Sequence, residues 1–327
     1  MIVKDNNTAA LQACGVETVG VVGAGTIGSG WAAHFLSRGL DVIATDPSPK
    51  AEKKLRSAVD NAWPSLEQLG LAKNASPDRL SFSTSLNIAL KDADFIQESI
   101  PEDEDIKDKV MAAISLEARP DIVIASSASG IVPTRLQAHC KNPQRMIVGH
   151  PFNPVYLIPL VEVVGGKHTA PETIQWAMEF YQHCGKAPLH CRVEKPGHLA
   201  NSLQDALLNE AIRLIADGIA TTGELDMALT AGPGLRWALI GSFLSAHIAA
   251  GEGGLRDIFT GKFDPGALMV ENPDWNVINR AITENQSQVA GRSLHEIEQM
   301  RDEFLVGVLK LRRKIEAKYG FNQGRFL

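Results

Sequence analysis

The feature that most constrains the fold is a glycine pattern placed between an apolar run and a helical run. Residues 18–22 read TVGVV, residues 23–28 read GAGTIG, and small and apolar residues continue through SGWAAHFLSRG. A strand that turns directly into a helix through such glycines is typical of a dinucleotide-binding α/β unit. The glycines allow a tight turn, a close approach of the backbone to a diphosphate, and close packing of the helix on the strand. The predicted dinucleotide loop consists of Gly23, Ala24, Gly25, Thr26, Ile27 and Gly28.

A carboxylate closes the next predicted strand, DVIATD at residues 41–46. At the end of the second strand of such a unit, a carboxylate accepts hydrogen bonds from the hydroxyl groups of the adenosine ribose. It also repels the additional phosphate that distinguishes NADP from NAD. Asp46 therefore predicts NAD as the cofactor.

The first part of the chain alternates short β-rich runs with helical stretches. Residues 1–195 are predicted to form a Rossmann-type domain, a doubly wound parallel sheet with helices on both faces. From Pro196 onwards, apolar residues recur at intervals of three and four, which predicts an all-helical domain over residues 196–327. The predicted strands span residues 18–25, 41–46, 94–99, 121–127, 145–150 and 160–166.

A long excursion separates the second and third predicted strands. Residues 47–80 exceed an ordinary loop and contain the helical stretch KAEKKLRSAVDNAWPSLEQLGL. The interpretation at this level is a pair of helices on the edge of the nucleotide domain, which would cover a substrate or simply pack.

Composition excludes several classes of function. A net charge of -6 over 327 residues argues against binding to a nucleic-acid backbone, which needs a concentrated basic surface. The four cysteines form no CxxC pair and have no companion histidines at metal-ligand spacing, so we expect reduced thiols, no metal, and a cytoplasmic location. No apolar run approaches the roughly 18 residues of a membrane span, and no signal-type segment is visible near Lys4 and Asp5, so neither export nor membrane anchoring is expected.

A carboxylate inside an apolar run marks the candidate catalytic centre. The stretch GHPFNPVYLIPLVEVV places Glu162 where a core strand would normally carry valine, twelve positions after His150. A buried carboxylate is costly unless it is paired, and the prolines between the two residues allow the chain to return. A histidine held by a carboxylate keeps one tautomer, and its other nitrogen can take a proton from an alcohol. From these residues alone, a structural His–Glu pair is equally compatible with the pattern.

The ordered motifs GAGTIGSG, SSASG, GHPFNP, VEVV and PGHLAN resemble those of the 3-hydroxyacyl-CoA dehydrogenase family. The resemblance covers most of the chain and implies a metal-independent, NAD-linked dehydrogenase. It implies that a His acts as general base, that a Glu orients it, and that a Ser and an Asn hold the substrate oxygen. The residues at those positions are His150, Glu162, Ser129 and Asn201. The resemblance also implies that Asn153 supports the nicotinamide and the base, and that Glu102 and Lys107 line the ribose and nicotinamide side of NAD.

One motif departs from the family pattern. Where the family has Gly-Phe-x-x-Asn-Arg, this chain reads GHLANS, so both the aromatic residue and the arginine are missing. His198, in place of the aromatic residue, is expected to pack or to cap the following helix rather than to touch the substrate.

Longer stretches of the chain, above all DGIATTGELDMALTAGPGLRWALIGSF, resemble members of the family that oxidise L-carnitine at its 3-hydroxyl group. The trimethylammonium group of that substrate is held best by aromatic faces and a nearby carboxylate. The candidate aromatic residues are Trp237, Phe243 and Tyr156, the candidate counter-charges are Glu224 and Asp226, and Arg236 or Ser129 would bind the substrate carboxylate. The resemblance further implies a homodimer formed largely through the helical domain.

Three alternatives remain open at this level. Two are enzymatic, with L-gulonate or a 3-hydroxyacyl-CoA as the substrate. Lysines and an arginine at 50–56 would then meet the phosphates of CoA. The third is a catalytically silent NAD-binding protein like some lens crystallins. The presence of all four predicted catalytic residues argues against the third.

Overall fold

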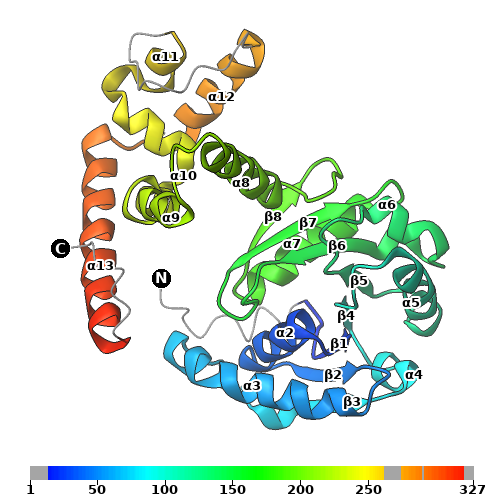
Figure 1. The fold of residues 1–327 in the computed structure, drawn as a ribbon. Coiled ribbons are helices and arrows are strands. Elements are labelled where there is room, and N and C mark those ends of the chain that lie inside the picture. Colours follow the sequence, from blue (N-terminus) through cyan, green and yellow to red (C-terminus); the bar gives the residue numbers. More distant parts are fainter. Residues whose placement is uncertain (1–13, 261–273, 289–290, 320–327) are drawn as a thin grey trace. The chain divides into compact units, whose positions relative to one another are not determined.

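The computed structural model describes residues 14–260, 274–288 and 291–319. The chain divides into two compact units, Met1–Ala206 and Leu207–Leu327. The first unit contains the sheet and the second is helical (Figure 1). The predicted fold class, an α/β sheet followed by an all-helical part, is confirmed.

The sheet of the first unit has eight strands in the order β3-β2-β1-β4-β5-β6-β7-β8. All neighbouring strands are parallel except β6 and β7, which pair antiparallel. Strand order reverses at β1 and β4, and open α/β sheets bind ligands at the carboxyl ends of the strands beside such a reversal. The strands are β1 Thr18–Val22, β2 Asp41–Thr45, β3 Leu80–Ser83, β4 Phe95–Glu98, β5 Val123–Ser126, β6 Met146–Pro151, β7 Leu160–Gly165 and β8 Ala187–Cys191.

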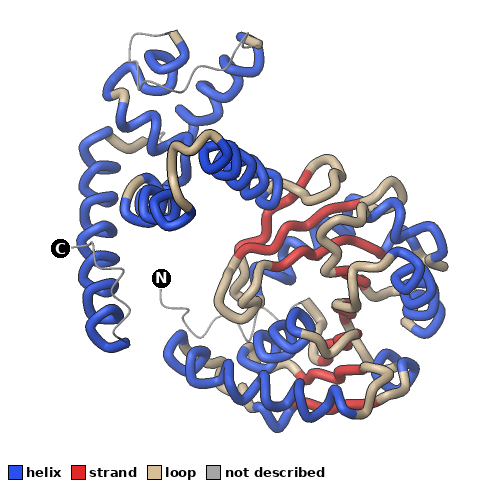
Figure 2. Tube along the Cα trace, in the orientation of Figure 1, coloured by secondary structure: helices blue, strands red, loops and turns tan. Residues whose placement is uncertain are grey.

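Helices cover both faces of this sheet (Figure 2). One buried cluster joins the sheet to α2, α3 and α7, and a second joins its other face to α4, α5 and α6. Alternation along the strands produces this division, since Val21 belongs to the first cluster and Val22 to the second. The helices are α2 Thr26–Ser37, α3 Lys50–Leu69, α4 Leu86–Leu90, α5 Glu104–Glu117, α6 Pro133–Leu136 and α7 Pro171–His183.

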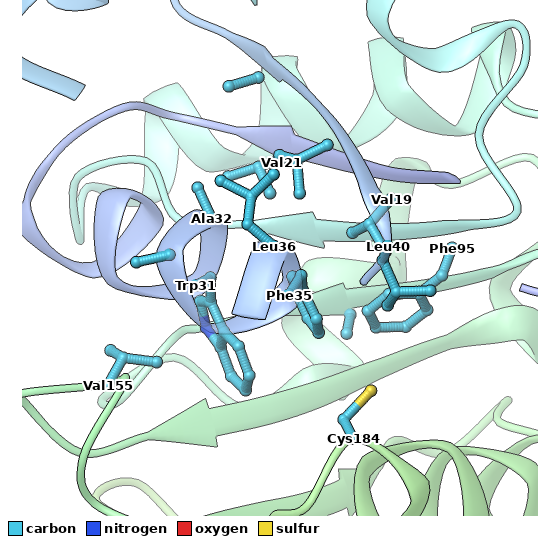
Figure 3. Packing of buried hydrophobic residues seen from close by; sticks show 14 of the residues in the cluster. Val19, Val21, Trp31, Ala32, Phe35, Leu36, Leu40, Phe95, Val155 and Cys184 are labelled. Atoms are coloured by element: carbon cyan, nitrogen blue, oxygen red, sulfur yellow. The ribbon is translucent and has the colours of Figure 1, made fainter. Parts of the chain in front are cut away.

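Aromatic rings fill the first cluster, and Figure 3 shows Trp31 and Phe35 of α2 pointing into it. The ring centroids of Trp31 and Phe35 are 5.1 Å apart, and those of Phe95 and Phe180 are 4.5 Å apart. Each buried aromatic side chain removes a large apolar area from water, worth about 1.5–3 kcal/mol. This packing fixes α2, and therefore the glycine loop that precedes it, on the sheet.

The structure differs from the sequence-based prediction in the excursion between β2 and β3. The predicted pair of helices is wrong, because α3 runs as one 20-residue helix through Pro64. Its buried residues Leu55, Val59, Ala62 and Leu66 follow one face of a helix, so packing of a continuous apolar face outweighs the cost of an internal proline.

Two strands were not predicted. In β3 only Leu80 is buried, and in β8 only Cys191 is buried. Both strands form edges of the sheet, where a strand has one neighbouring strand and its other side faces solvent. Neither strand therefore carries a strong apolar signal.

The second unit is built from helices around a small apolar core. Leu255, Ile258, Ile278 and Ile282 form that core. The first of the helices, α8, begins in the first unit and ends in the second. Among the described residues, no helix is both long and apolar enough to cross a membrane. The helices are α8 Ala200–Ala216, α9 Thr222–Ala231, α10 Pro233–Ala249, α11 Gly254–Phe259, α12 Trp275–Gln288 and α13 Leu294–Tyr319.

Candidate active site

His150 and Glu162 lie opposite each other in the antiparallel pair of β6 and β7. The Nδ1 atom of His150 lies 2.9 Å from Oε2 of Glu162, whose side chain is fully buried. A carboxylate accepts hydrogen bonds but cannot donate one when ionised, so Nδ1 carries the ring proton. That tautomer leaves Nε2 of His150 with a free lone pair, which is the arrangement that a general base requires.

The second oxygen of Glu162 meets the start of α8. Its Oε1 accepts hydrogen bonds from the backbone amides of Leu199 and Ala200, each 2.9 Å long. Burial raises the pKa of the Glu162 carboxyl group, but the hydrogen bonds from His150 and from the two amides outweigh burial and hold that pKa below its usual value. Glu162 is therefore ionised at neutral pH and can stabilise a positive charge on His150.

Lys186 supports the turn that connects β6 and β7. The turn from 152 to 159 contains a cis Asn153–Pro154 peptide bond. The buried ammonium group of Lys186 donates hydrogen bonds to the carbonyl oxygens of Val155 and Ile158 inside this turn. Burial lowers the pKa of Lys186 to about 7. The turn that returns Glu162 to His150 is thus held from within.

Ser129 and Asn201, which are 72 positions apart in the chain, lie side by side. The Nδ2 atom of Asn201 donates a 2.7 Å hydrogen bond to Oγ of Ser129. Ser129 follows β5 in the turn 127–131, and Asn201 lies in the first turn of α8. The amide of Gly197 also donates to the carbonyl of Ser129, at 3.0 Å. The structure therefore brings together the two neutral groups that the sequence singled out.

Glu102 organises the turn that carries Ser129. Its Oε1 accepts hydrogen bonds from the amides of Ser129, Gly130 and Ile131 at 3.0, 2.7 and 3.1 Å. Three amides on one carboxylate oxygen form a small anion-binding turn, here filled by the side chain of the protein itself. Sequence reasoning placed Glu102 beside the cofactor but missed this second contact.

A cavity of about 740 Å³ connects His150, Ser129 and Glu102 to the glycine loop. Its volume lies within the range of cofactor and ligand sites in proteins. His150, Ser129, Glu102 and Asp46 all contribute to its wall. The remaining lining residues are Gly23, Gly25, Thr26, Ile27, Pro47, Ser99, Ile100, Pro101, Ile106, Val110, Ser127 and Pro151.

The glycine loop has the geometry that a dinucleotide requires. Gly23 has φ of 95°, and a Cβ atom there would lie 2.7 Å from the carbonyl oxygen of Ser99. A Cβ atom on Gly28 would lie 1.8 Å from the carbonyl oxygen of Gly23, whereas a Cβ atom on Gly25 would meet no atom within 4 Å. The open space at Gly25 and the start of α2, which has no side-chain cap, leave backbone amides free for a diphosphate.

Asp46 lies directly beside this loop. One of its carboxylate oxygens accepts a hydrogen bond from the amide of Ala24 at 3.2 Å, and the other accepts one from the amide of Ser48 at 3.0 Å. These contacts hold the carboxylate at the end of β2, where it contributes to the cavity wall. The residues present therefore fit NAD.

Lys107 and Asn153 do not contribute to the described cavity wall. The ammonium group of Lys107 is buried and forms a 2.7 Å ion pair with the buried Glu98. Its place beside the NAD ribose, expected from the resemblance, stays a prediction. Asn153 is exposed and precedes the cis bond to Pro154.

Sequence reasoning missed a buried hydrogen-bond chain under the cavity. The hydroxyl of Tyr181 donates to Oε1 of Gln97 at 2.6 Å, and Nε2 of Gln97 donates to Oγ of Ser127 at 2.9 Å. Ser127 in turn lies 2.9 Å from Oγ of Ser99. The signal in the sequence is Gly149, since a Cβ atom there would lie 2.1 Å from the Tyr181 hydroxyl.

The predicted substrate residues fall in both units. Arg236, Trp237 and Phe243 lie on α10 in the second unit, with Trp237 39% and Phe243 55% exposed. Tyr156 is partly buried and packs against the first core cluster of the sheet unit. On α9, Glu224 takes part in a capping box with Thr221. Their contacts with a substrate stay predictions, as does the role of Asp226.

Known proteins resemble this chain over most of its length. The family model "3-hydroxyacyl-CoA dehydrogenase, NAD binding domain" matches residues 18–194, and "3-hydroxyacyl-CoA dehydrogenase, C-terminal domain" matches residues 197–286. The chain is 48% identical over 305 residues to L-carnitine dehydrogenase of Bacillus cereus, covering 91% of this chain and 93% of that protein. It is 44% identical over 301 residues to L-carnitine dehydrogenase of Streptomyces coelicolor, covering 90% and 94%.

Among solved structures, a similar one is (S)-3-hydroxybutyryl-CoA dehydrogenase from Ralstonia eutropha. The two chains are 30% identical with a TM-score of 0.61, and the match covers 76% of this chain and 89% of the other. The sheet order, the glycine loop and the His150–Glu162 pair thus occur in a chain that both family models match across most of its length. The protein is an NAD-binding member of the 3-hydroxyacyl-CoA dehydrogenase family.

Proposed function

We propose that the protein catalyses the NAD-dependent oxidation of L-carnitine at its 3-hydroxyl group, giving 3-dehydrocarnitine. The observation that carries this proposal is the 44–48% identity, over nine-tenths or more of the chain, to L-carnitine dehydrogenases. The position of His150 in the wall of a cavity that begins at the glycine loop supports a hydride transfer in that cavity.

His150 is the proposed general base. Its Nε2 atom takes the hydroxyl proton of the substrate, and the resulting imidazolium is stabilised by the ionised Glu162. NAD, when bound, accepts the hydride that leaves the same carbon atom. The alcohol thus loses one proton and one hydride and becomes a ketone, and no metal ion is needed.

Ser129 and Asn201 are the proposed ligands of the substrate oxygen. That oxygen gains negative character as His150 takes its proton, and neutral donors aimed at it lower the barrier. The 2.7 Å hydrogen bond from Asn201 to Ser129 supports the proposal, since it holds the two side chains together. Glu102 also holds this turn, because its Oε1 accepts hydrogen bonds from the amides of the turn.

Recognition of the rest of the substrate is part of this proposal. The trimethylammonium group would contact Trp237, Phe243 or Tyr156, with Glu224 or Asp226 as a counter-charge, and Arg236 or Ser129 would bind the carboxylate. The proposal also includes a homodimer formed by the helical domain, residues 196–327, with residues 1–195 as the NAD-binding domain. The four free cysteines support a cytoplasmic location.

An initial-rate assay of NAD reduction tests the function. L-carnitine, D-carnitine, L-gulonate, 3-hydroxybutyrate and 3-hydroxybutyryl-CoA are offered at equal concentration. We expect L-carnitine to exceed every other compound in kcat/KM by at least roughly 100-fold, as the loss of a well-placed polar or charged contact would give. If only the CoA thioester or only L-gulonate is turned over, that compound replaces L-carnitine as the proposed substrate. Absence of NADH with every compound would favour a silent NAD-binding protein.

A further inference from the structure

His198 lies beside His150 and beside the turn that carries Ser129, although no step of the proposed reaction uses it. Its side chain is 2% exposed, and its ring centroid lies 5.1 Å from that of His150. Its Nε2 atom lies 3.1 Å from the carbonyl oxygen of Ala128, the residue before Ser129. His198 therefore connects the turn of Ser129 with the segment that begins α8.

The partner of Nε2 determines the tautomer of His198. A carbonyl oxygen only accepts hydrogen bonds, so Nε2 must carry the proton and donate it. The Nδ1 atom is buried and has no hydrogen-bond partner among the described residues. Burial lowers the pKa of His198, and the neighbouring His150 lowers it further, although the bond to Ala128 opposes both effects. The ring is thus neutral while His150 gains and loses a proton.

The backbone of the same residue serves Glu162. His198 has φ of 49°, the one positive φ of a non-glycine residue in the described part of the chain. This left-handed conformation, which follows Gly197 at φ of 76°, directs the next two amides to Oε1 of Glu162. Such a conformation is unfavourable for a non-glycine residue, so it persists only where surrounding contacts hold it.

We propose that His198 is a positioning residue. The hydrogen bond that its Nε2–H group donates to the carbonyl oxygen of Ala128 holds the turn of Ser129 in place relative to His150 and Glu162. Without this bond the Ala128 carbonyl oxygen is left unpaired in a buried place, and the turn relaxes. A small displacement of Ser129 then weakens its contact with the substrate oxygen, while the NAD loop at 23–28 is untouched. The inference rests on the proposed function for its kinetic consequence only.

Two variants separate the hydrogen bond from the packing of the ring. His198→Gln keeps a donor nitrogen at the same number of bonds from the backbone but loses the ring. His198→Phe keeps a ring of similar size but loses the donor. We expect kcat to fall roughly tenfold in His198→Phe and to stay within about threefold of wild type in His198→Gln. The KM for NAD is expected to change less than about twofold in both variants.

Three results would overturn this inference. These are full kcat in His198→Phe, equal losses in both variants, and a loss in KM for NAD rather than in kcat. Thermal melting of both variants identifies a kinetic loss that comes from unfolding. If wild type prefers another hydroxy acid, only the substrate proposal fails, and the variants are compared on that acid with the same expectation.

Spectroscopy of the wild-type protein tests the bond without any substrate. In ¹⁵N-labelled protein, we expect the imidazole signals of His198, assigned by their loss in His198→Phe, to show the neutral Nε2–H tautomer at pH 7. A Nδ1–H tautomer or an imidazolium at that pH would contradict the donation to Ala128. This outcome does not depend on which compound the enzyme oxidises.

Discussion

His150 and Glu162 occupy directly opposed positions of β6 and β7, and the 2.9 Å bond between them joins the only antiparallel pair in the described sheet. The connection between the two strands, residues 152–159, is shorter than the dozen or more residues that a crossover between parallel strands needs, so the strands pair antiparallel. The antiparallel return therefore accounts for the carboxylate in an apolar strand. It places a buried negative charge beside the proposed base.

Glu162→Gln tests the orienting carboxylate. The neutral amide no longer stabilises an imidazolium at position 150. When its oxygen accepts the hydrogen bonds of the Leu199 and Ala200 amides, its NH₂ group faces Nδ1 of His150 and favours the tautomer that protonates Nε2. We expect kcat to fall by roughly 100-fold or more and the melting temperature to decrease. Unchanged turnover across pH 6–9 would defeat the orienting role.

Lys186→Met tests the charge inside the turn 152–159. The folded-state pKa of Lys186 is about 7, below its unfolded value of about 10.4. The unfolded chain therefore binds more protons between these values, and wild-type stability should rise with pH there, by up to about 1.4 kcal/mol per pH unit. Below pH 7 the penalty is fully present.

The measurement is the free energy of unfolding by urea at pH 7, 8 and 9. The free energy of unfolding of wild type minus that of Lys186→Met, in which contributions from other groups largely cancel, is expected to increase with pH. A difference that stays constant would show that the ammonium group is not penalised by burial.

Asp46→Ala tests the choice of cofactor. Removing the carboxylate removes a repulsion against the NADP phosphate and two acceptors that hold the amides of Ala24 and Ser48. The ratio of kcat/KM for NAD over NADP is expected to fall at least roughly tenfold. Asp41→Ala, at the opposite end of β2, is the matched control and should retain the wild-type ratio. An unaltered ratio in Asp46→Ala would mean that another group selects the ribose.

Gly149→Ala tests the close approach of Tyr181. The new Cβ atom would lie 2.1 Å from the Tyr181 hydroxyl, so the hydrogen bond to Gln97 must break or the strand must shift. We expect a loss of about 1–3 kcal/mol in the free energy of unfolding.

Gly25→Ala is the matched control for Gly149→Ala. Its Cβ atom meets no atom within 4 Å, so stability should be unchanged while NADH binding weakens. Equal stability of Gly149→Ala and wild type would show that the strand adapts.

The sequence predicted the elements that carry a strong local signal. The interior strands of the sheet are apolar runs. The glycine loop and Asp46 stand at the ends of two of these runs, and their residue types fit one backbone geometry, that of a dinucleotide-binding turn. Edge strands β3 and β8 lack that signal, and the unbroken α3 depends on tertiary packing that outweighs the proline rule at Pro64. Local patterns do not report such packing.

Within the candidate site, the limits were set by long-range contacts. Glu162 predicted a partner because a lone buried carboxylate is costly, and His150 was near in sequence. The inward pairing of Lys107 with Glu98 and the chain from Tyr181 to Ser99 involve side chains that no spacing rule relates. The contact of Glu102 with three amides likewise depends on how two separate turns meet.

The central claim is that His150 takes the proton from the 3-hydroxyl group of L-carnitine. The most direct measurement is NADH formation from L-carnitine by wild type and His150→Ala, with NADH affinity measured by fluorescence on the same samples. The account predicts that His150→Ala loses at least roughly 100-fold in kcat while the Kd for NADH changes less than about threefold. Turnover by His150→Ala near the wild-type rate would contradict it.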